Sequence, residues 1–158
     1  MNNRQEVIDY VFLNLKIISQ LKDGQKLRVR KINDLDILDI DNRYIYKYFR
    51  GAYGDNRDNT MNVIKHIIDL AYNMSDEILN EETEENKKNK KSPFDSEDDN
   101  TILFRKLVSE MEKSLEGLKK LKITYEDDIS ISSMLELLMS KITSRITKIN
   151  SLFTISRK

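Results

Sequence analysis

Hydrophobic residues recur at spacings of three and four over residues 4–21, and this pattern predicts an amphipathic helix. The hydrophobic face of this helix consists of Val7, Ile8, Val11, Leu15, Ile18 and Leu21. Asp23 and Gly24 follow it, and glycine readily adopts the left-handed backbone conformation that often ends a helix. We therefore expect the first helix to end at this Asp-Gly pair.

Residues 25–41 follow a different pattern, in which polar and hydrophobic residues alternate. Residues 27–30 are Leu-Arg-Val-Arg, and a second run of Leu, Ile and Asp over residues 35–41 follows the turn-forming pair Asn33-Asp34. This arrangement predicts a short β-hairpin, although the second run is also compatible with a helical turn. Because an isolated hairpin is only marginally stable, we expect it to pack on the helices.

Two further hydrophobic stripes predict long helices. A second helix over residues 59–80 is expected to be capped by Asp58 or Asn59, because short polar side chains cap helix N-termini. Its hydrophobic face consists of Val63, Ile64, Ile67, Ile68, Ala71, Met74 and Ile78. A third helix is expected over residues 99–121. Its hydrophobic face consists of Leu103, Leu107, Met111, Leu115, Leu118 and Leu121.

A fourth helix follows a short turn over residues 123–128 and has the most regular pattern in the chain. Its stripe consists of Ile131, Leu135, Leu138, Ile142, Ile146, Ile149 and Phe153. Asp128 or Ser130 is expected to cap this helix. Two antiparallel helices with a short link form an αα-hairpin, and neither can bury its stripe alone. We therefore expect this pair to pack on the first two helices or on another chain.

Residues 80–100 differ from the helices because they are rich in Glu, Lys, Asn and Asp, with Phe94 as their one strong hydrophobe. Such a segment cannot bury enough apolar surface to offset the entropy lost on ordering, so we predict a flexible, disordered linker. The predicted fold is mainly α, with about four amphipathic helices in a bundle and a small β-hairpin insertion. Residues 1–79 and the helical hairpin of residues 101–158 are expected to form one composite domain.

The composition excludes several classes of chemistry. The 158 residues include no Cys and one His, which removes disulfides, thiolate nucleophiles and cysteine-based metal sites. Four Gly and two Ala disfavour Rossmann folds, P-loops and TIM barrels. The abundance of Ile, Lys and Asn indicates an A/T-rich genome. The chain shows no signal-peptide pattern and no apolar run long enough to span a membrane, so we expect a soluble, cytoplasmic protein.

Two stretches of the chain carry a resemblance to known proteins. Residues 49–60 are Phe-Arg-Gly-Ala-Tyr-Gly-Asp-Asn-Arg-Asp-Asn-Thr, and residues 115–128 are Leu-Glu-Gly-Leu-Lys-Lys-Leu-Lys-Ile-Thr-Tyr-Glu-Asp-Asp, followed by an amphipathic helix. Together they resemble small, all-helical, uncharacterised proteins of nucleocytoplasmic large DNA viruses. The resemblance implies a viral setting, in a host cell or a virion, and assigns no activity to particular residues.

A basic and tyrosine-rich segment over residues 28–57 is a candidate nucleic-acid or phosphate site. Its members are Arg28, Arg30, Lys31, Arg43, Lys47, Arg50, Arg57, Tyr46 and Tyr53. Basic side chains neutralise phosphates, and aromatic rings stack on exposed bases. The alternative is that the aromatic residues pack under the hairpin while the basic groups are solvated or pair with nearby Asp residues. Residues 1–60 hold eleven basic and nine acidic residues, a smaller surplus than nucleic-acid binders usually have.

Three other motifs also have a simple structural explanation. His66 and Asp69 are spaced to form a general-base pair, or His66 lies at the edge of an apolar stripe. The glycine-rich loop over residues 51–57 leads into a helix that could hold a phosphate, or it is a turn and cap. The acidic residues 95–99 lack the ligand spacing of an EF-hand and favour a solvated linker. We predict no catalytic residue, no metal site and no cofactor.

The stripe of the fourth helix is the candidate interaction surface, because an apolar stripe with charged flanks is typical of an interaction helix. The alternative use of such a stripe is core packing. We predict a non-catalytic helical interaction or structural protein whose partner is another protein or a second copy of the chain. In a viral setting it would be virion-associated or bind a host factor. The alternative function is a nucleic-acid-binding accessory protein that uses residues 28–57.

Overall fold

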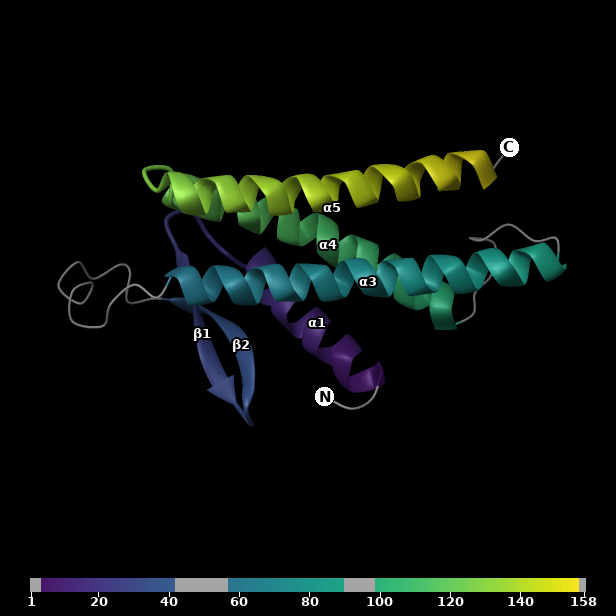
Figure 1. Cartoon of the computed structure of the whole chain (residues 1–158), viewed down its shortest axis with the longest axis horizontal. Helices are drawn as coiled ribbons and strands as arrows, with labels where there is room; N and C mark the ends of the chain where they lie inside the picture. Colours follow the sequence, from purple (N-terminus) through teal and green to yellow (C-terminus); the bar gives the residue numbers. More distant parts are fainter. Residues whose placement is uncertain (1–3, 42–56, 90–98, 157–158) are drawn as a thin grey trace.

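The structure, a computed structural model, describes residues 4–41, 57–89 and 99–156. These residues form helices α1 (Arg4–Ser19), α3 (Arg57–Asn89), α4 (Asp99–Thr124) and α5 (Ile129–Ser156), with strands β1 (Lys26–Ile32) and β2 (Leu35–Asp41). α3 and α5 run in the same direction and α4 runs antiparallel to both (Figure 1). α1 packs mainly on α4, and the hairpin projects from the end of the bundle where α3 begins. The predicted mainly α fold with a small hairpin is confirmed.

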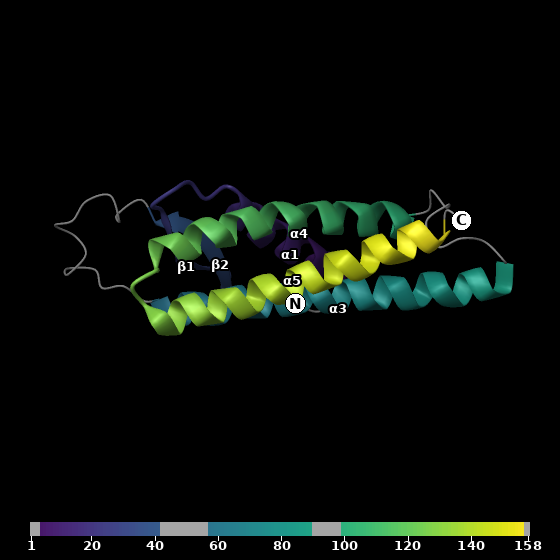
Figure 2. The same ribbon diagram turned by 90° about the horizontal axis from the view of Figure 1, so that it is seen from above.

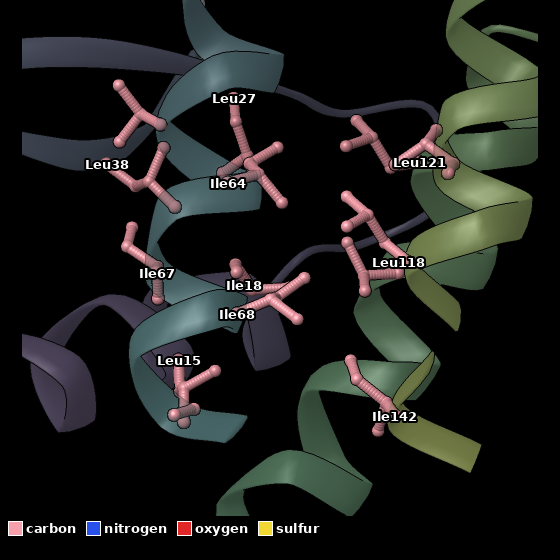
Figure 3. Close-up of a cluster of buried hydrophobic side chains, with 14 of the residues drawn as sticks. Leu15, Ile18, Leu27, Leu38, Ile64, Ile67, Ile68, Leu118, Leu121 and Ile142 are labelled. Atoms are coloured by element: carbon pink, nitrogen blue, oxygen red, sulfur yellow. The ribbon is translucent and has the colours of Figure 1, made fainter. Parts of the chain in front are cut away.

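One hydrophobic core joins the four helices and the hairpin. Figure 3 shows ten of its buried side chains: Leu15, Ile18, Leu27, Leu38, Ile64, Ile67, Ile68, Leu118, Leu121 and Ile142. A second, smaller cluster of Ile78, Phe104 and Ile149 lies where α3, α4 and α5 continue together (Figure 2). The hydrophobic stripes of the helices therefore cover one another, as amphipathic helices must to be stable in water.

α1 packs tightly against α4 at Gly117. A Cβ atom at this position would lie 2.7 Å from the carbonyl carbon of Ile18, so only glycine leaves room for the backbone of α1. One turn later, the Nζ of Lys120 donates a hydrogen bond to the carbonyl oxygen of Leu21 at 3.3 Å. These two contacts hold the end of α1 and the residues that follow it on α4.

The strands β1 and β2 form an antiparallel hairpin in which Ile32 lies opposite Leu35 and Arg30 lies opposite Ile37. Asn33 and Asp34 connect the strands with φ angles of 52° and 65°, and a type I′ turn requires such positive φ angles at both central residues. The predicted hairpin is confirmed, and the helical-turn alternative for its second run is wrong.

Two polar side chains of α1 bind the outer edge of β2. The Tyr10 hydroxyl donates to the carbonyl oxygen of Asp36 at 2.5 Å, and the N–H of Leu38 donates to Oδ1 of Asn14 at 2.8 Å. Asn14 is completely buried, and its Nδ2 donates to the carbonyl oxygen of Tyr10 at 2.7 Å. Because buried backbone groups need hydrogen-bond partners, these bonds satisfy the strand edge and hold the hairpin on α1.

Asp128 caps the N-terminus of α5 and links this helix to α3. Its Oδ1 accepts a hydrogen bond from the N–H of Ile131 at 3.2 Å, which is the geometry of an N-terminal cap. Its Oδ2 lies 2.9 Å from Nε of Arg57, the first residue of α3. Of the two predicted caps of the fourth helix, Asp128 is therefore the one observed.

Several predicted boundaries differ from the structure. α1 ends at Ser19, and Gly24 follows in a turn with a φ of 83°, as expected of a residue in the left-handed conformation. α3 begins at Arg57, so Asp58 and Asn59 lie in its first turn and the predicted cap is wrong. α3 also continues to Asn89, so the first ten residues of the predicted linker are helical. Glu and Lys are good helix formers, and extending an existing helix is far easier than starting one.

No helix in the described ranges is both long and apolar enough to cross a membrane.

Candidate interaction surface between α1 and the hairpin

The structure places the predicted basic residues of β1 beside carboxylates of β2. Nε and Nη2 of Arg28 lie 3.1 and 2.9 Å from one carboxylate oxygen of Asp39, and Nη1 of Arg30 lies 3.7 Å from the same atom. Lys31 pairs with Asp36 at 3.8 Å. For these three residues the structure agrees with the alternative in which basic groups pair with nearby aspartates.

The rest of the predicted nucleic-acid segment is divided. Arg57 lies at the start of α3, where it pairs with Asp128 of α5. Five further members of the predicted set lie outside the described residues: Arg43, Lys47, Arg50, Tyr46 and Tyr53. The glycine-rich loop before Arg57 and the acidic residues 95–98 also lie outside them.

His66 and Asp69 are not joined by a hydrogen bond. Oδ1 of Asp69 accepts a hydrogen bond from Nζ of Lys141 at 2.6 Å, whereas the His66 side chain is exposed and makes no hydrogen bond within the described part of the chain. His66 lies at the edge of a pocket of about 350 Å³ whose lining also includes Tyr10, Asp36 and Asn62. Among the described residues, no cluster of three or more His, Asp or Glu side chains could hold a metal ion.

The stripe of α5 packs inside the chain. Ile131, Leu135, Leu138 and Ile142 belong to the main core, Ile146 packs against it, and Ile149 belongs to the smaller cluster. The side chain of Phe153 lies outside the described residues. The described part of the stripe is therefore not available as an outward interaction surface, because α3 and α4 of the same chain pack on α5 and supply the apolar faces that cover it.

An exposed apolar surface instead lies between α1 and the hairpin. Leu13 on α1 is 46% exposed and Ile32 at the end of β1 is 43% exposed, and exposed apolar side chains are informative where they gather in one patch. Between them, Leu35 and Ile37 of β2 are half-buried. A pocket of about 500 Å³ opens here, lined by Glu6, Asp9, Tyr10, Leu13, Asn33, Leu35 and Ile37.

The strand register shows which hairpin side chains belong to this surface. Side chains that are directly opposite in a ladder, or two residues apart on one strand, share a face of the sheet. Leu35 and Ile37 line the pocket, so the residues opposite and next to them share their face. We call the resulting set the α1–hairpin surface, and it consists of Glu6, Asp9, Tyr10, Leu13, Arg28, Arg30, Ile32, Asn33, Leu35, Ile37 and Asp39.

The charges of the α1–hairpin surface are separated into two flanks. On α1, Glu6 and Asp9 are both acidic and exposed. On the hairpin, Arg28 and Arg30 share the single carboxylate of Asp39, so this flank keeps one positive charge in excess. The surface therefore runs from an acidic flank on α1, across an apolar centre, to a basic flank on β1.

The hydrogen bonds that hold this surface also restrict what can bind there. Tyr10 and Asn14 occupy the Asp36 carbonyl and the Leu38 N–H on the outer edge of β2, so a partner strand cannot pair with these groups. Burial, and next the Asp36 carboxylate, raise the pKa of the Tyr10 hydroxyl above its ordinary value, so this hydroxyl stays protonated and able to donate even in mildly alkaline solution. Recognition at this edge of β2 must therefore use side chains.

A second pocket, of about 400 Å³, lies between α1, α3 and α4. Its lining is mainly apolar, with Val7 and Ile8 from α1, Met74 from α3 and Leu103 from α4 among its members. The nearby charged residues, Arg4 and Glu77, are of opposite sign. Asn73 is the remaining polar residue of the lining.

A charged cluster between α3 and α5 was not predicted from the sequence. Nη2 of Arg145 lies 2.5 Å from Oδ1 of Asp76, and its guanidinium lies 4.0 Å from the ring centroid of Tyr72. Lys141, one turn earlier, lies over the same ring while it binds Asp69. Arg145 is only 3% exposed, and its Nε and Nη1 have no hydrogen-bond partner among the described residues. The cluster orders α5 on α3 and is closed to solvent at Arg145.

Sequence signals for the missed residues were present but ambiguous. Asn14 lies between Val11 and Ile18 on the apolar stripe of α1, a position where a polar residue is expected to be buried and bonded. Leu13 lies off that stripe, and only its location beside β2 distinguishes it from an isolated surface leucine.

Comparisons with known proteins found no matching family model, no matching curated protein and no matching solved structure.

Proposed function

We propose that this protein has a non-catalytic role and acts by binding another protein chain through the α1–hairpin surface. The observation that carries the proposal is the exposure of Leu13 and Ile32 around a pocket with an apolar centre and charged flanks. An apolar centre with a polar rim is the usual anatomy of a protein–protein interface. The surface is also firmly held, because Asn14 and Tyr10 bond the hairpin to α1.

The charge pattern of the hairpin favours this role over nucleic-acid binding. Arg28, Arg30 and Lys31 each have an aspartate neighbour within 4 Å, so a phosphate would have to compete with a carboxylate that is already in place. A nucleic-acid binder gains most of its affinity from cations that release counterions from the phosphates. We therefore do not propose nucleic-acid binding, and the experiment below includes it as a contrary outcome.

Site-specific photocrosslinking tests the proposal. A photoreactive phenylalanine analogue is placed at Leu13, and in a control protein at Leu137, which is 71% exposed on α5. Extracts of the source cell are used, together with virions if the viral setting holds. The proposal expects a defined protein adduct from position 13 that is absent from position 137. The captured protein is then purified, and Leu13→Glu must weaken its binding at least tenfold while Leu137→Glu does not.

Two results would contradict the proposed function. Equal adducts from both positions would mean that any exposed apolar side chain captures the same proteins, so that the α1–hairpin surface is not a specific binding site. A steep, salt-dependent affinity for DNA or RNA that Leu13→Glu leaves unchanged would indicate that the residues of the basic segment act instead. Circular dichroism of each variant checks that the helices are retained.

A further inference from the structure

We infer that the occupant of the α1–hairpin surface is a second copy of this chain, in a two-fold symmetric dimer. The inference rests on the proposed function, because it takes this surface to be a protein-binding surface and names the partner. The observation behind it is the order of chemistry across the surface: Glu6 and Asp9 on one side, an apolar centre, and Arg28 and Arg30 on the other.

This order is self-complementary. In a symmetric dimer the same patch is used by both subunits, so that if residue i contacts residue j, then j also contacts i. A two-fold axis that lies in the interface along the apolar centre brings the acidic flank of each copy onto the basic flank of the other. Asp9 would then face Arg30 of the second copy, and the same contact would occur twice.

The charges select a second copy over partners of a single charge sign. A basic partner would be attracted to Asp9 and repelled by Arg30, which is 56% exposed and keeps free guanidinium surface beside Asp39. An acidic partner would be attracted to Arg30 and repelled by Asp9. A copy of the same surface satisfies both flanks at once, and complementary charge is what sets the orientation of an interface.

The shape of the surface agrees with the same arrangement. Ile32 projects at the end of β1, next to the turn, whereas Leu13, Leu35 and Ile37 line a pocket of about 500 Å³. The projecting Ile32 of one copy can enter the pocket of the other. Because the strand edge at Asp36 and Leu38 is already bonded to α1, the contact uses these side chains and not strand pairing.

Charge exchange between the two flanks tests this inference. The variants are Asp9→Lys, Arg30→Glu and the double variant that carries both changes. Glu112→Lys on α4 and Lys148→Glu on α5 make the same charge changes at exposed sites away from the surface. The mass of each protein is measured by sedimentation velocity over a range of concentrations up to about 1 mM, the weak limit of measurable association.

The wild-type chain is expected to dimerise with increasing concentration. Asp9→Lys alone and Arg30→Glu alone each place like charges together twice, so each should raise the dimer dissociation constant at least about tenfold. A mixture of the two single variants should form a heterodimer, because both of its contacts are attractive again. The double variant should dimerise with itself for the same reason, and the two control variants should match the wild type. High salt should reduce the differences.

Three outcomes would overturn the inference. One is a wild-type chain that stays monomeric over the whole range. Another is a dimer that neither single variant weakens, since it must use another surface. The third is failure of both the mixture and the double variant to restore association while circular dichroism shows them folded. If the chain is monomeric but position 13 still crosslinks to a different protein, the proposed function stands and only the second-copy partner is wrong. If the chain is monomeric and position 13 forms no specific crosslink, both the proposed function and the second-copy partner are wrong.

Discussion

The tight contact of α1 with α4 makes Gly117 an informative position for a stability test. In Gly117→Ala the added methyl carbon would lie 2.7 Å from the carbonyl carbon of Ile18, closer still to its oxygen, and 3.1 Å from its Cγ2. Carbon atoms in contact are normally about 3.5–4.0 Å apart. The atom in the way belongs to the backbone of α1, so no side-chain rotation relieves the overlap, and α1 must move away from α4 by about 1 Å.

Two opposing effects set the size of this change. Alanine is better than glycine inside a helix by about 1 kcal/mol. Overpacking a filled core costs about 1–3 kcal/mol, and more where the backbone must move. Here the movement separates Ile18 and Leu118, which are both completely buried. We therefore expect Gly117→Ala to lower the free energy of unfolding by about 2 kcal/mol, which corresponds to a fall in Tm of about 4–8 °C for a chain of this size.

Urea unfolding followed by circular dichroism at 222 nm, a standard helix signal, measures this free energy. Ser140 on α5 is exposed and provides the control, since Ser140→Ala should be more stable than Ser140→Gly by about 1 kcal/mol from helix propensity alone. If Gly117→Ala is as stable as the natural chain or more stable, with an unchanged m value, the higher helix propensity of alanine outweighs any overlap with α1. The close approach of α1 to α4 would then be refuted.

Three other predictions concern buried polar groups. Asn14→Leu should lower the free energy of unfolding by about 2 kcal/mol or more, because it leaves the Leu38 N–H buried and unpaired. The midpoint of urea denaturation measures this change. An unchanged midpoint would show that water solvates the strand edge. The raised pKa of Tyr10 means that the fold favours the protonated hydroxyl, so its stability contribution is present below about pH 10 and is lost as the pH rises above that value. The stability difference between the natural chain and Tyr10→Phe should therefore narrow in alkaline titrations, and a constant difference would contradict the assignment. Asp76→Ala should lower the free energy of unfolding by about 3 kcal/mol, because it leaves the buried Arg145 without its carboxylate. Arg145→Met should lower it by less than about 1 kcal/mol, because Asp76 is 44% exposed and stays in contact with water. Equal losses of stability for the two variants in thermal unfolding would contradict this difference.

Local sequence patterns were sufficient for most of the secondary structure. Periodicity of three and four located the four helices that the structure describes, because a helix that packs on one side must repeat its apolar residues at that spacing. Asn33-Asp34 identified the hairpin turn, since these residues tolerate the positive φ angles observed there. Asp128 was one of two candidate caps, and the structure selects it. The end of α3 was missed because composition alone suggests a linker. Adding residues to an established helix costs little free energy, since the unfavourable nucleation step has already been made.

The candidate surface required the tertiary structure. The stripe of α5 could serve as core or as an interface, and the choice depends on whether other helices of the same chain cover it, which periodicity does not encode. In the hairpin, alternation shows that two faces exist but not which one meets the core. The structure turns Leu38 inward and leaves Leu35 and Ile37 on the pocket side.

The helices, the hairpin and the absence of cysteine chemistry were predictable from the sequence, because they depend on composition and on residues close together in the chain. The folded structure was needed to show that Asn14 completes the edge of β2, that Arg28 and Arg30 share Asp39, and that Leu13 and Ile32 are left exposed together. Burial, hydrogen-bond pairing and charge pairing depend on contacts between distant segments. Such contacts exist only once the helices have packed.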